Sequence, residues 1–334
     1  MQAVRRALGV LVAVVVMVGV VGEGAASARG HERAVAQLAE GGLPDPSPLR
    51  ARGHVAVFGT GPGFPVLVST RYGRGFRSSG FAMPRSGLPR WFGTGIGGTR
   101  HLWAPHVARV APARGRRGPA YNLYFAATRR GGRDCIGVAR SSRPAHGFRT
   151  VGGPLVCGGR RATAIDPSVY VGPQGRRWLT FVRRDRVSGV GQIRIIALRR
   201  DGLRLRPGAR SRVLVSNGRT ITEAPSMLTY GGATWLFVSR HSYRGCGYRT
   251  EVYRARTPGG RFTPAGPHHG RLVLRSRAGR VLCGAGGGEV LRTGRTVRFY
   301  FHAWRHGTEW TGGRRVPFVA RLRWRHGHPV VARR

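Results

Sequence analysis

The chain has 334 residues and carries 58 basic side chains against 12 acidic ones, which gives a formal net charge of +46 at pH 7. All 58 are arginines, and they are scattered along the chain without a nucleic-acid-binding motif, so the sequence excludes a specific nucleic-acid partner. We attribute the arginines to codon usage in a GC-rich genome and expect only non-specific adsorption to anionic surfaces.

Residues 1–28 have the features of an export signal. Arg5 and Arg6 precede an apolar run over 7–21, and Ala26-Ser27-Ala28 provides a small-residue cleavage site. A retained membrane anchor is the alternative, but this run is shorter than the roughly twenty residues that span a bilayer. We therefore expect a secreted, extracellular protein, with a polar and poorly specified lead-in over residues 29–42.

From residue 43 onward, strand-like segments recur at a long and regular interval. Each is rich in aromatic and β-branched residues and ends on an aromatic side chain: 55–58, 121–125, 178–181, 235–237 and 297–301. The closing aromatic residues are 67, 56, 56 and 64 positions apart, and a second strand-like segment follows most of them. Five units of about 60 residues, each with several short strands, are typical of a β-propeller.

The sequence thus predicts an all-β chain in which residues 43–334 form one five-bladed β-propeller domain. The 54 glycines, which supply turns, and the scarcity of helix-type periodicity support the all-β prediction. A β-sandwich is the alternative, but it would not produce such a long period. In a propeller the innermost strand of each blade lines a central channel.

Four cysteines in an exported protein indicate two disulfides, for which three pairings exist. We favour Cys135 with Cys157, because each flanks a strand-like segment and the two are one hairpin apart. Cys246 and Cys283 would then form the second disulfide.

Three of the few carboxylates precede the apolar strands of three different units. Asp45, Asp166 and Glu223 lie 13, 15 and 14 residues before the closing aromatic residue of their units. Equivalent positions in a ring of blades face the same end of the channel, so we expect the three side chains to converge. Two carboxyl groups facing one hollow suit the cleavage of a glycosidic bond, with one as general acid and the other as base.

Five short motifs, one in each unit and in the right order, resemble those of the glycoside hydrolases of family 43. They are Asp45-Pro46-Ser47, Trp103-Ala104-Pro105-His106, Ile165-Asp166-Pro167-Ser168, Glu223-Ala224-Pro225-Ser226 and Phe301-His302-Ala303-Trp304. The resemblance extends from about Pro44 to Trp304. Family members are five-bladed propellers that cut arabinans, arabinoxylan side chains or xylo-oligosaccharides with inversion.

The resemblance implies a role for each matched residue. Asp45 would be the general base, Glu223 the general acid, and Asp166 the residue that orients the acid and raises its pKa. Trp103 would stack on a sugar, although a core position is an equal alternative. His106, which stands where the family motif has an aspartate, would contact the substrate.

His302 would hold an ion such as calcium in the channel; the alternative is a buried histidine that only forms hydrogen bonds. We expect no organic cofactor, a polysaccharide or oligosaccharide as substrate, and a monomer. The glycine-rich loop 283–288 would approach the substrate, and the remaining carboxylates would be structural: Asp134, Asp185, Asp201, Glu251, Glu289 and Glu309. A non-catalytic propeller that binds carbohydrate or the cell envelope is the alternative function.

Overall fold

The central strands of this fold are buried on both faces. In β7 (Ala120–Arg129) and β16 (Ala233–Arg240), nearly every residue is buried, and both sequences are almost continuously apolar or aromatic. Strands with this composition cannot leave one face in water, so each sheet must pack between two others. The computed structural model describes residues 35–332 except 52, 94–101, 111–117, 217, 219, 276–279 and 306–313. The predicted signal segment lies outside the described residues.

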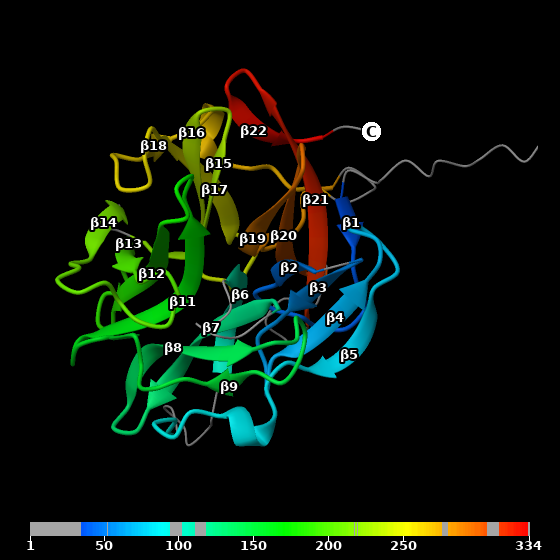
Figure 1. Cartoon of the computed structure of the whole chain (residues 1–334). Helices are drawn as coiled ribbons and strands as arrows, with labels where there is room; N and C mark the ends of the chain where they lie inside the picture. Colours follow the sequence, from blue (N-terminus) through cyan, green and yellow to red (C-terminus); the bar gives the residue numbers. More distant parts are fainter. Residues whose placement is uncertain are drawn as a thin grey trace, which may run out of the picture. The chain divides into compact units, whose positions relative to one another are not determined.

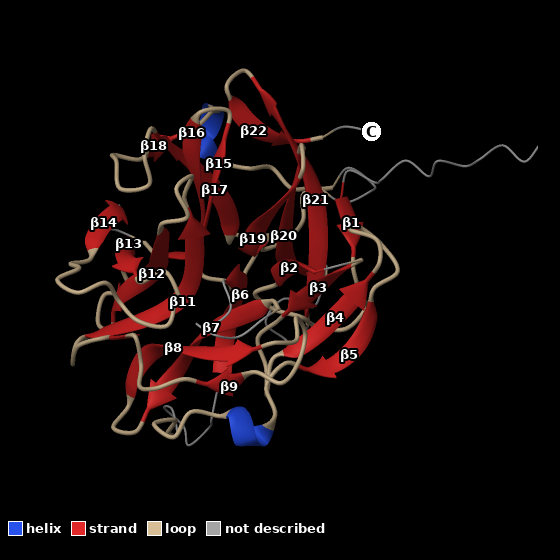
Figure 2. Ribbon diagram, viewed as in Figure 1, coloured by secondary structure: helices blue, strands red, loops and turns tan. Residues whose placement is uncertain are grey.

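Five antiparallel sheets form the blades of a β-propeller, as the sequence predicted (Figures 1 and 2). Blade 1 contains β2 to β5: Ser47–Ala51, His54–Phe58, Pro65–Ser69 and Arg77–Phe81. Blade 2 contains β6 to β10: Leu102–Val110, Ala120–Arg129, Arg133–Ser141, Arg149–Thr150 and Val156–Cys157. Blade 3 contains β11 to β14: Ala162–Val171, Arg177–Asp185, Gly191–Leu198 and Arg212–Val215.

Blade 4 contains β15 to β18: Thr222–Tyr230, Ala233–Arg240, Arg249–Ala255 and Thr263–Pro264. Blade 5 contains β19 to β22: Gly286–Thr293, Thr296–Trp304, Arg315–Arg325 and His328–Val331. The two helical segments of the described residues are single turns, η1 (Arg85–Gly87) and α1 (Pro267–Gly270). None of the described helices is long and apolar enough to cross a membrane.

The first strand of each blade lies at the centre of the ring. Each of β2, β6, β11, β15 and β19 contacts the first strand of the next blade, and β19 contacts β2. The closing aromatic residues pack between the blades and are 0–3% exposed: Phe58, Phe125, Phe181, Phe237 and Phe301. Their regular spacing in the sequence therefore reflects one buried aromatic position in each blade.

Blade 5 also takes up a strand from the start of the described chain. In β1 (Val35–Gln37), Val35 pairs with Ala320 and Gln37 with Phe318 of β21. Leu38 and Leu43, which follow this strand, are buried in the cluster between blades 5 and 1. The segment 29–42, expected as a poorly specified lead-in, thus contributes β1 and the buried Leu38 to the closure of the ring, because β21 would otherwise present an unpaired edge there.

Both predicted disulfides are present. Cys135 of β8 faces Cys157 of β10 across the ladder, so this bond fastens two strands of blade 2. Cys246 lies between β16 and β17 of blade 4, whereas Cys283 lies just before β19 of blade 5. The second bond therefore ties two adjacent blades together at the entrance to β19.

Candidate active site

A β-bulge recurs near the start of the innermost strand in four of the five blades. The register of the first two strands slips by a bulge between Trp103 and His106 in blade 2, and at the equivalent points of blades 3, 4 and 5. One residue near each of these points, and one just before β2, has a positive φ of 48–59°: Asp45, Ala104, Asp166, Ala224 and Gly287. These five residues form a ring around one end of the channel, and a bulge of this kind turns side chains out of the sheet.

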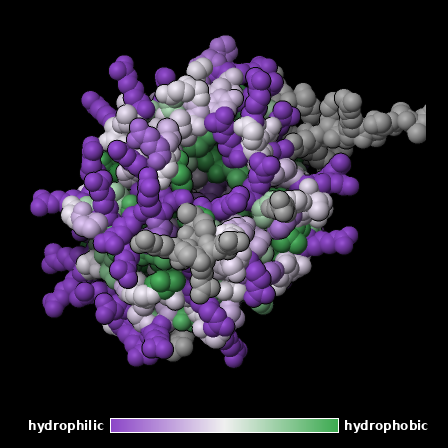
Figure 3. Space-filling model, viewed as in Figure 1, coloured by the Kyte–Doolittle hydropathy of each residue, from purple (hydrophilic) through white to green (hydrophobic). Residues whose placement is uncertain are grey.

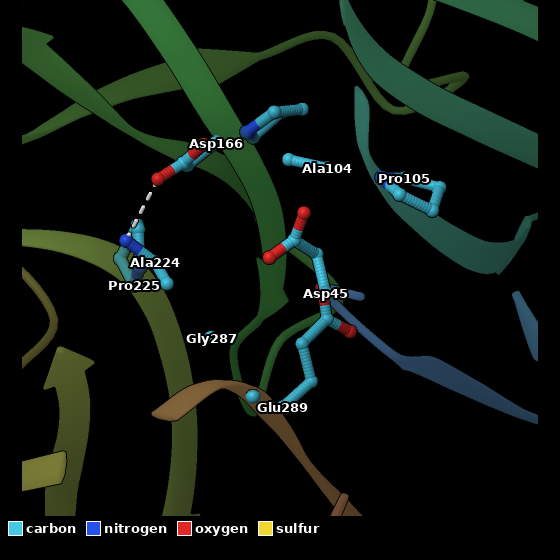
Figure 4. Close-up of a pocket in the computed structure, with 10 residues that line it drawn as sticks. Asp45, Ala104, Pro105, Asp166, Ala224, Pro225, Gly287 and Glu289 are labelled. Carbon is cyan, nitrogen blue, oxygen red and sulfur yellow. Dashed lines mark hydrogen bonds between the residues drawn. The ribbon is translucent and has the colours of Figure 1, made fainter. Parts of the chain in front are cut away.

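The ring lines a small pocket with a volume of about 30 Å³, enough for one or two water molecules. Asp45 and Asp166 point into it from blades 1 and 3, and Gly287 and Glu289 line it from blade 5 (Figure 4). Figure 3 shows the hollow near the middle of a face whose hydrophilic side chains project on all sides. The predicted convergence of Asp45 and Asp166 is thus present in the structure.

Glu223 belongs to the same group although it stands one residue before the positive-φ residue of its blade. The Ala224 N–H donates to Asp166 Oδ2 at 3.0 Å, which places the start of the blade 4 bulge against the blade 3 carboxylate. The charges of Glu223 and Asp45 both raise the pKa of Asp166, in addition to burial, which is the largest cause. Carboxyl groups from blades 1, 3 and 4 therefore interact across the pocket.

Burial keeps Glu223 protonated at a higher pH than an ordinary glutamate. The residue is 7% exposed, and desolvation raises the pKa of its carboxyl group to about 7. Three groups oppose this shift: the Arg184 guanidinium, 3.6 Å from Oε2, the Tyr248 hydroxyl, and the charge of Arg315. Burial is the largest cause of this raised pKa, and the charge of Asp45 adds to it. The expected repulsion between the carboxyl groups of Glu223 and Asp166 is also present, and it raises the pKa of Asp166.

The Asp45 side chain is held in place by contacts that involve three blades. The Thr60 hydroxyl donates to Oδ2 at 2.5 Å, and the same hydroxyl accepts the Ala104 N–H of blade 2 at 2.8 Å. From blade 5, Arg315 Nη1 lies 3.4 Å from Oδ1, and His302 Nδ1 accepts the Asp45 backbone N–H at 3.1 Å. A donor therefore meets each oxygen of the Asp45 side chain, which fixes its orientation at the pocket.

His302 is a hydrogen-bonding residue, and its surroundings do not fit a bound cation. The imidazole is fully buried, its Nδ1 lone pair accepts the Asp45 N–H, and its Nε2 lies 3.5 Å from Arg315 Nη1. Burial and the charge of Arg315 lower the pKa of His302 well below its ordinary value. A cation would have to displace the guanidinium, and the described residues include no cluster of three or more His, Cys, Asp or Glu side chains that could bind a metal.

Trp103 and His106 do not line the pocket as the sequence suggested. Trp103 is half-buried against the core cluster between blades 3 and 4, which fits the alternative of a core position. His106 donates from Nδ1 to the Glu289 carboxylate at 2.9 Å, below the level of Asp45 and Asp166. Glu289, which was expected to be structural, pairs with His106 and also lines the pocket.

One sequence signal could have identified Glu289. It stands two residues after a positive-φ residue, as Ser47, His106, Ser168 and Ser226 do in the other blades. The repeat was hidden in blade 5 because glycines replace the Asp-Pro or Ala-Pro pair. At Gly287 a Cβ atom would collide with the His302 ring, so the room next to His302 requires glycine.

Most of the other carboxylates have structural partners away from the pocket. Asp134 pairs with Arg186, and Glu251 pairs with Arg240 and Arg249. Asp185 accepts backbone N–H groups within its turn, and Asp201 accepts the Leu203 N–H. Glu309 lies outside the described residues. The expectation that the first four are structural therefore agrees with their contacts.

Comparisons with known proteins agree with this geometry. The crystal structure of a thermostable family-43 glycoside hydrolase superimposes with a TM-score of 0.73 at 18% identity, over 88% of this chain and 93% of that chain. An exo-1,5-α-L-arabinanase from a bovine ruminal metagenomic library gives a TM-score of 0.67 at 20% identity, over 87% of this chain and 97% of that chain. A xylan β-1,4-xylosidase from Bacillus halodurans C-125 superimposes with a TM-score of 0.67 at 15% identity, over 87% of this chain and 55% of that chain.

No sequence among the curated proteins matches the chain. The family described as Glycosyl hydrolases family 43 matches residues 38–329, which include all five blades and every residue of the pocket. With the propeller, the ring of carboxyl groups and this match together, the chain belongs to family 43 of the glycosyl hydrolases.

Proposed function

We propose that this glycosyl hydrolase cleaves arabinose- or xylose-containing polysaccharides or oligosaccharides with inversion at the anomeric carbon. The observation that carries the assignment is the interaction between two carboxyl groups: Glu223, whose pKa is raised to about 7, and Asp45, which lines the pocket and accepts a hydrogen bond from Thr60. Inverting hydrolases need this pair, with the two groups far enough apart to admit a water molecule.

Each group has one part in the reaction. Glu223 gives its proton to the glycosidic oxygen, so the leaving group departs as an alcohol. Asp45 takes a proton from a water molecule, whose oxygen forms the new bond to the anomeric carbon from the opposite side. Asp166 accepts the Ala224 N–H beside Glu223 and orients the acid. One water is consumed, and both protons are accounted for.

The sugar is proposed from the similar solved structures, which include an arabinanase and a xylosidase. Aryl α-L-arabinofuranosides, aryl β-D-xylosides and linear arabinan form the test panel. Proton NMR of the first product, recorded before mutarotation, gives the stereochemical outcome. Product with retained configuration would contradict the inverting mechanism, and binding without any product would favour the non-catalytic alternative.

Substitution separates the roles of the two groups. Removal of a general acid or base costs about 10²- to 10⁴-fold in rate. Glu223→Gln should lose much less activity on an aryl glycoside, whose phenolate leaves without protonation, than on arabinan. Asp45→Asn should lose activity equally on both, because attack by water is needed in each case. Equal losses for Glu223→Gln on both substrates would refute its assignment as the acid.

We also propose that the protein is exported. Two disulfides are typical of proteins that fold in an oxidising compartment. Mass spectrometry of the culture medium should find a mature chain that begins near Arg29, and an intact N-terminus on cell-associated protein would contradict export.

A further inference from the structure

A second ring of polar side chains lies next to the pocket, and one of its members, Glu289, also lines the pocket. Its five members each stand two residues after the positive-φ residue of an innermost strand: Ser47, His106, Ser168, Ser226 and Glu289. Most of them contact another blade within the channel. The Ser47 hydroxyl donates to Glu289 Oε2 at 2.9 Å, and Ser168 Oγ lies 3.5 Å from His106 Nδ1. Ser226 Oγ accepts the Val290 N–H at 3.0 Å.

The contact between His106 and Glu289 differs from the others in its span. It joins blade 2 to blade 5, which are separated by blade 1, so it reaches across the channel. His106 Nδ1 is 2.9 Å from both carboxylate oxygens, and the two side chains are only 12% and 13% exposed. His106 Nε2 is buried without a hydrogen-bond partner among the described residues, so Glu289 is what orients the ring.

Asp45 depends on the two blades that this contact joins. From blade 2, the Ala104 N–H donates to Thr60 Oγ1, whose hydroxyl donates to the Asp45 carboxylate. From blade 5, His302 accepts the Asp45 N–H. His106 follows Ala104 by two residues, and Glu289 lies on β19, which is paired with the strand of His302. A shift of either blade would therefore disturb the hydrogen bonds that hold Asp45.

We propose that His106 and Glu289 are a positioning pair, which fixes the distance between blades 2 and 5 and thereby the orientation of the Asp45 carboxylate. The inference rests on the proposed role of Asp45 as general base. His106 stands where the family motif that it resembles has an aspartate. In this chain the carboxylate at this level is that of Glu289 from blade 5, which contacts His106. Neither side chain of the pair is assigned a proton transfer or a contact with the reacting atoms.

The test compares two substitutions of similar size. In His106→Asn, the side-chain amide nitrogen replaces Nδ1 and can still donate to Glu289, whereas His106→Leu removes the donor. An error of about 1 Å in the placement of a reacting group costs about 10²-fold in rate. We therefore expect a tenfold to hundredfold loss of kcat for His106→Leu with little change in KM, and most of the kcat retained by His106→Asn.

A second ion pair between blades serves as the matched control. Asp134 of blade 2 lies 3.2 Å from Arg186, which follows β12 of blade 3, and neither residue lines the pocket. Asp134→Asn also removes a contact between blades, but no donor of Asp45 depends on it. Its kcat should equal that of the wild type. This result would show that the loss of an ion pair between blades does not by itself lower kcat.

Crystal structures of the two His106 variants provide a measure that is independent of turnover. The Ala104–Thr60 and Thr60–Asp45 hydrogen bonds should persist in His106→Asn and break or lengthen in His106→Leu. Intact hydrogen bonds in His106→Leu, or equal kcat values in the two folded variants, would overturn the inference. An inactive wild type would instead count against the proposed function, and the crystal structures would still decide whether the pair positions Asp45.

Discussion

The pH dependence of the reaction should be set in part by Arg184. Its guanidinium lies 3.6 Å from Glu223 Oε2, is 31% exposed, and favours the ionised form of the acid. Coulomb's law at this distance gives about 1 kcal/mol in a water-like dielectric and about 5 kcal/mol at an effective dielectric constant of about 20. Because Arg184 is nearly a third exposed, we take the lower end, and about 1.4 kcal/mol corresponds to about one pH unit.

The sign follows from the charge. Arg184→Gln removes a positive charge that stabilises the Glu223 carboxylate, so the pKa of Glu223 should rise above its value of about 7. The acid then stays protonated to higher pH. The alkaline limb of the kcat/KM profile, which reports the free enzyme, should move up by about one pH unit.

The assay is the pH profile of kcat/KM on arabinan or on the xyloside that proves to be a substrate. Arg184→Lys keeps the charge and should leave the limb near its wild-type position. Arg199→Gln, which removes an arginine after β13 of the same blade, controls for the change in net charge. An alkaline limb that stays in place or moves to lower pH in Arg184→Gln would refute the reasoning.

Three further predictions concern stability and the pocket wall. The pKa of Glu223 is about 7 in the fold, against 4.5 for an ordinary glutamate side chain, so its ionisation destabilises the fold as pH rises between these values. Glu223→Gln should therefore increase the unfolding free energy by about 3 kcal/mol at pH 8, and raise the melting temperature accordingly, but change both very little at pH 4. Equal effects at the two pH values would contradict this. Gly287→Ala should lose activity and stability, since its Cβ would collide with the His302 ring at a φ of +59°; a variant with wild-type kcat and melting temperature would contradict this steric argument. Cys246→Ser should lower the unfolding free energy by about 4 kcal/mol, because the disulfide with Cys283 closes a loop with a sequence separation of 37, and an unchanged denaturant midpoint would show that the bond adds nothing.

Much of the site could be predicted because a propeller repeats one local structure. A residue with a positive φ recurs at the same point of each blade, and Asp45 and Asp166 occupy this position in blades 1 and 3. Aspartate tolerates this conformation better than most residues. A carboxylate followed by Pro-Ser before an apolar strand therefore carried information about its place on the channel rim. Glu223 was found by the same pattern although its place is shifted by one residue.

The arginines that contact those carboxylates could not be predicted, because they do not occupy a position that recurs from blade to blade. Arg184 reaches Glu223 from the end of β12, and Arg315 reaches Asp45 from the start of β21. Each is one arginine among many in the sequence. Burial, which raises the pKa of Glu223, depends on all the blades that surround the channel and leaves no mark on the local sequence.

By itself the sequence determined the number of blades, the buried aromatic position of each blade and three carboxyl groups on the rim. These follow from periodicity, since one strand pattern repeated five times can bury its faces only in a closed ring. The tertiary structure alone decided that β1 closes blade 5, that His106 meets Glu289 across the channel and that Arg315 stands beside His302. Each of these pairs residues far apart in the chain or on different strands, and such pairs form only where the closed ring brings their strands together.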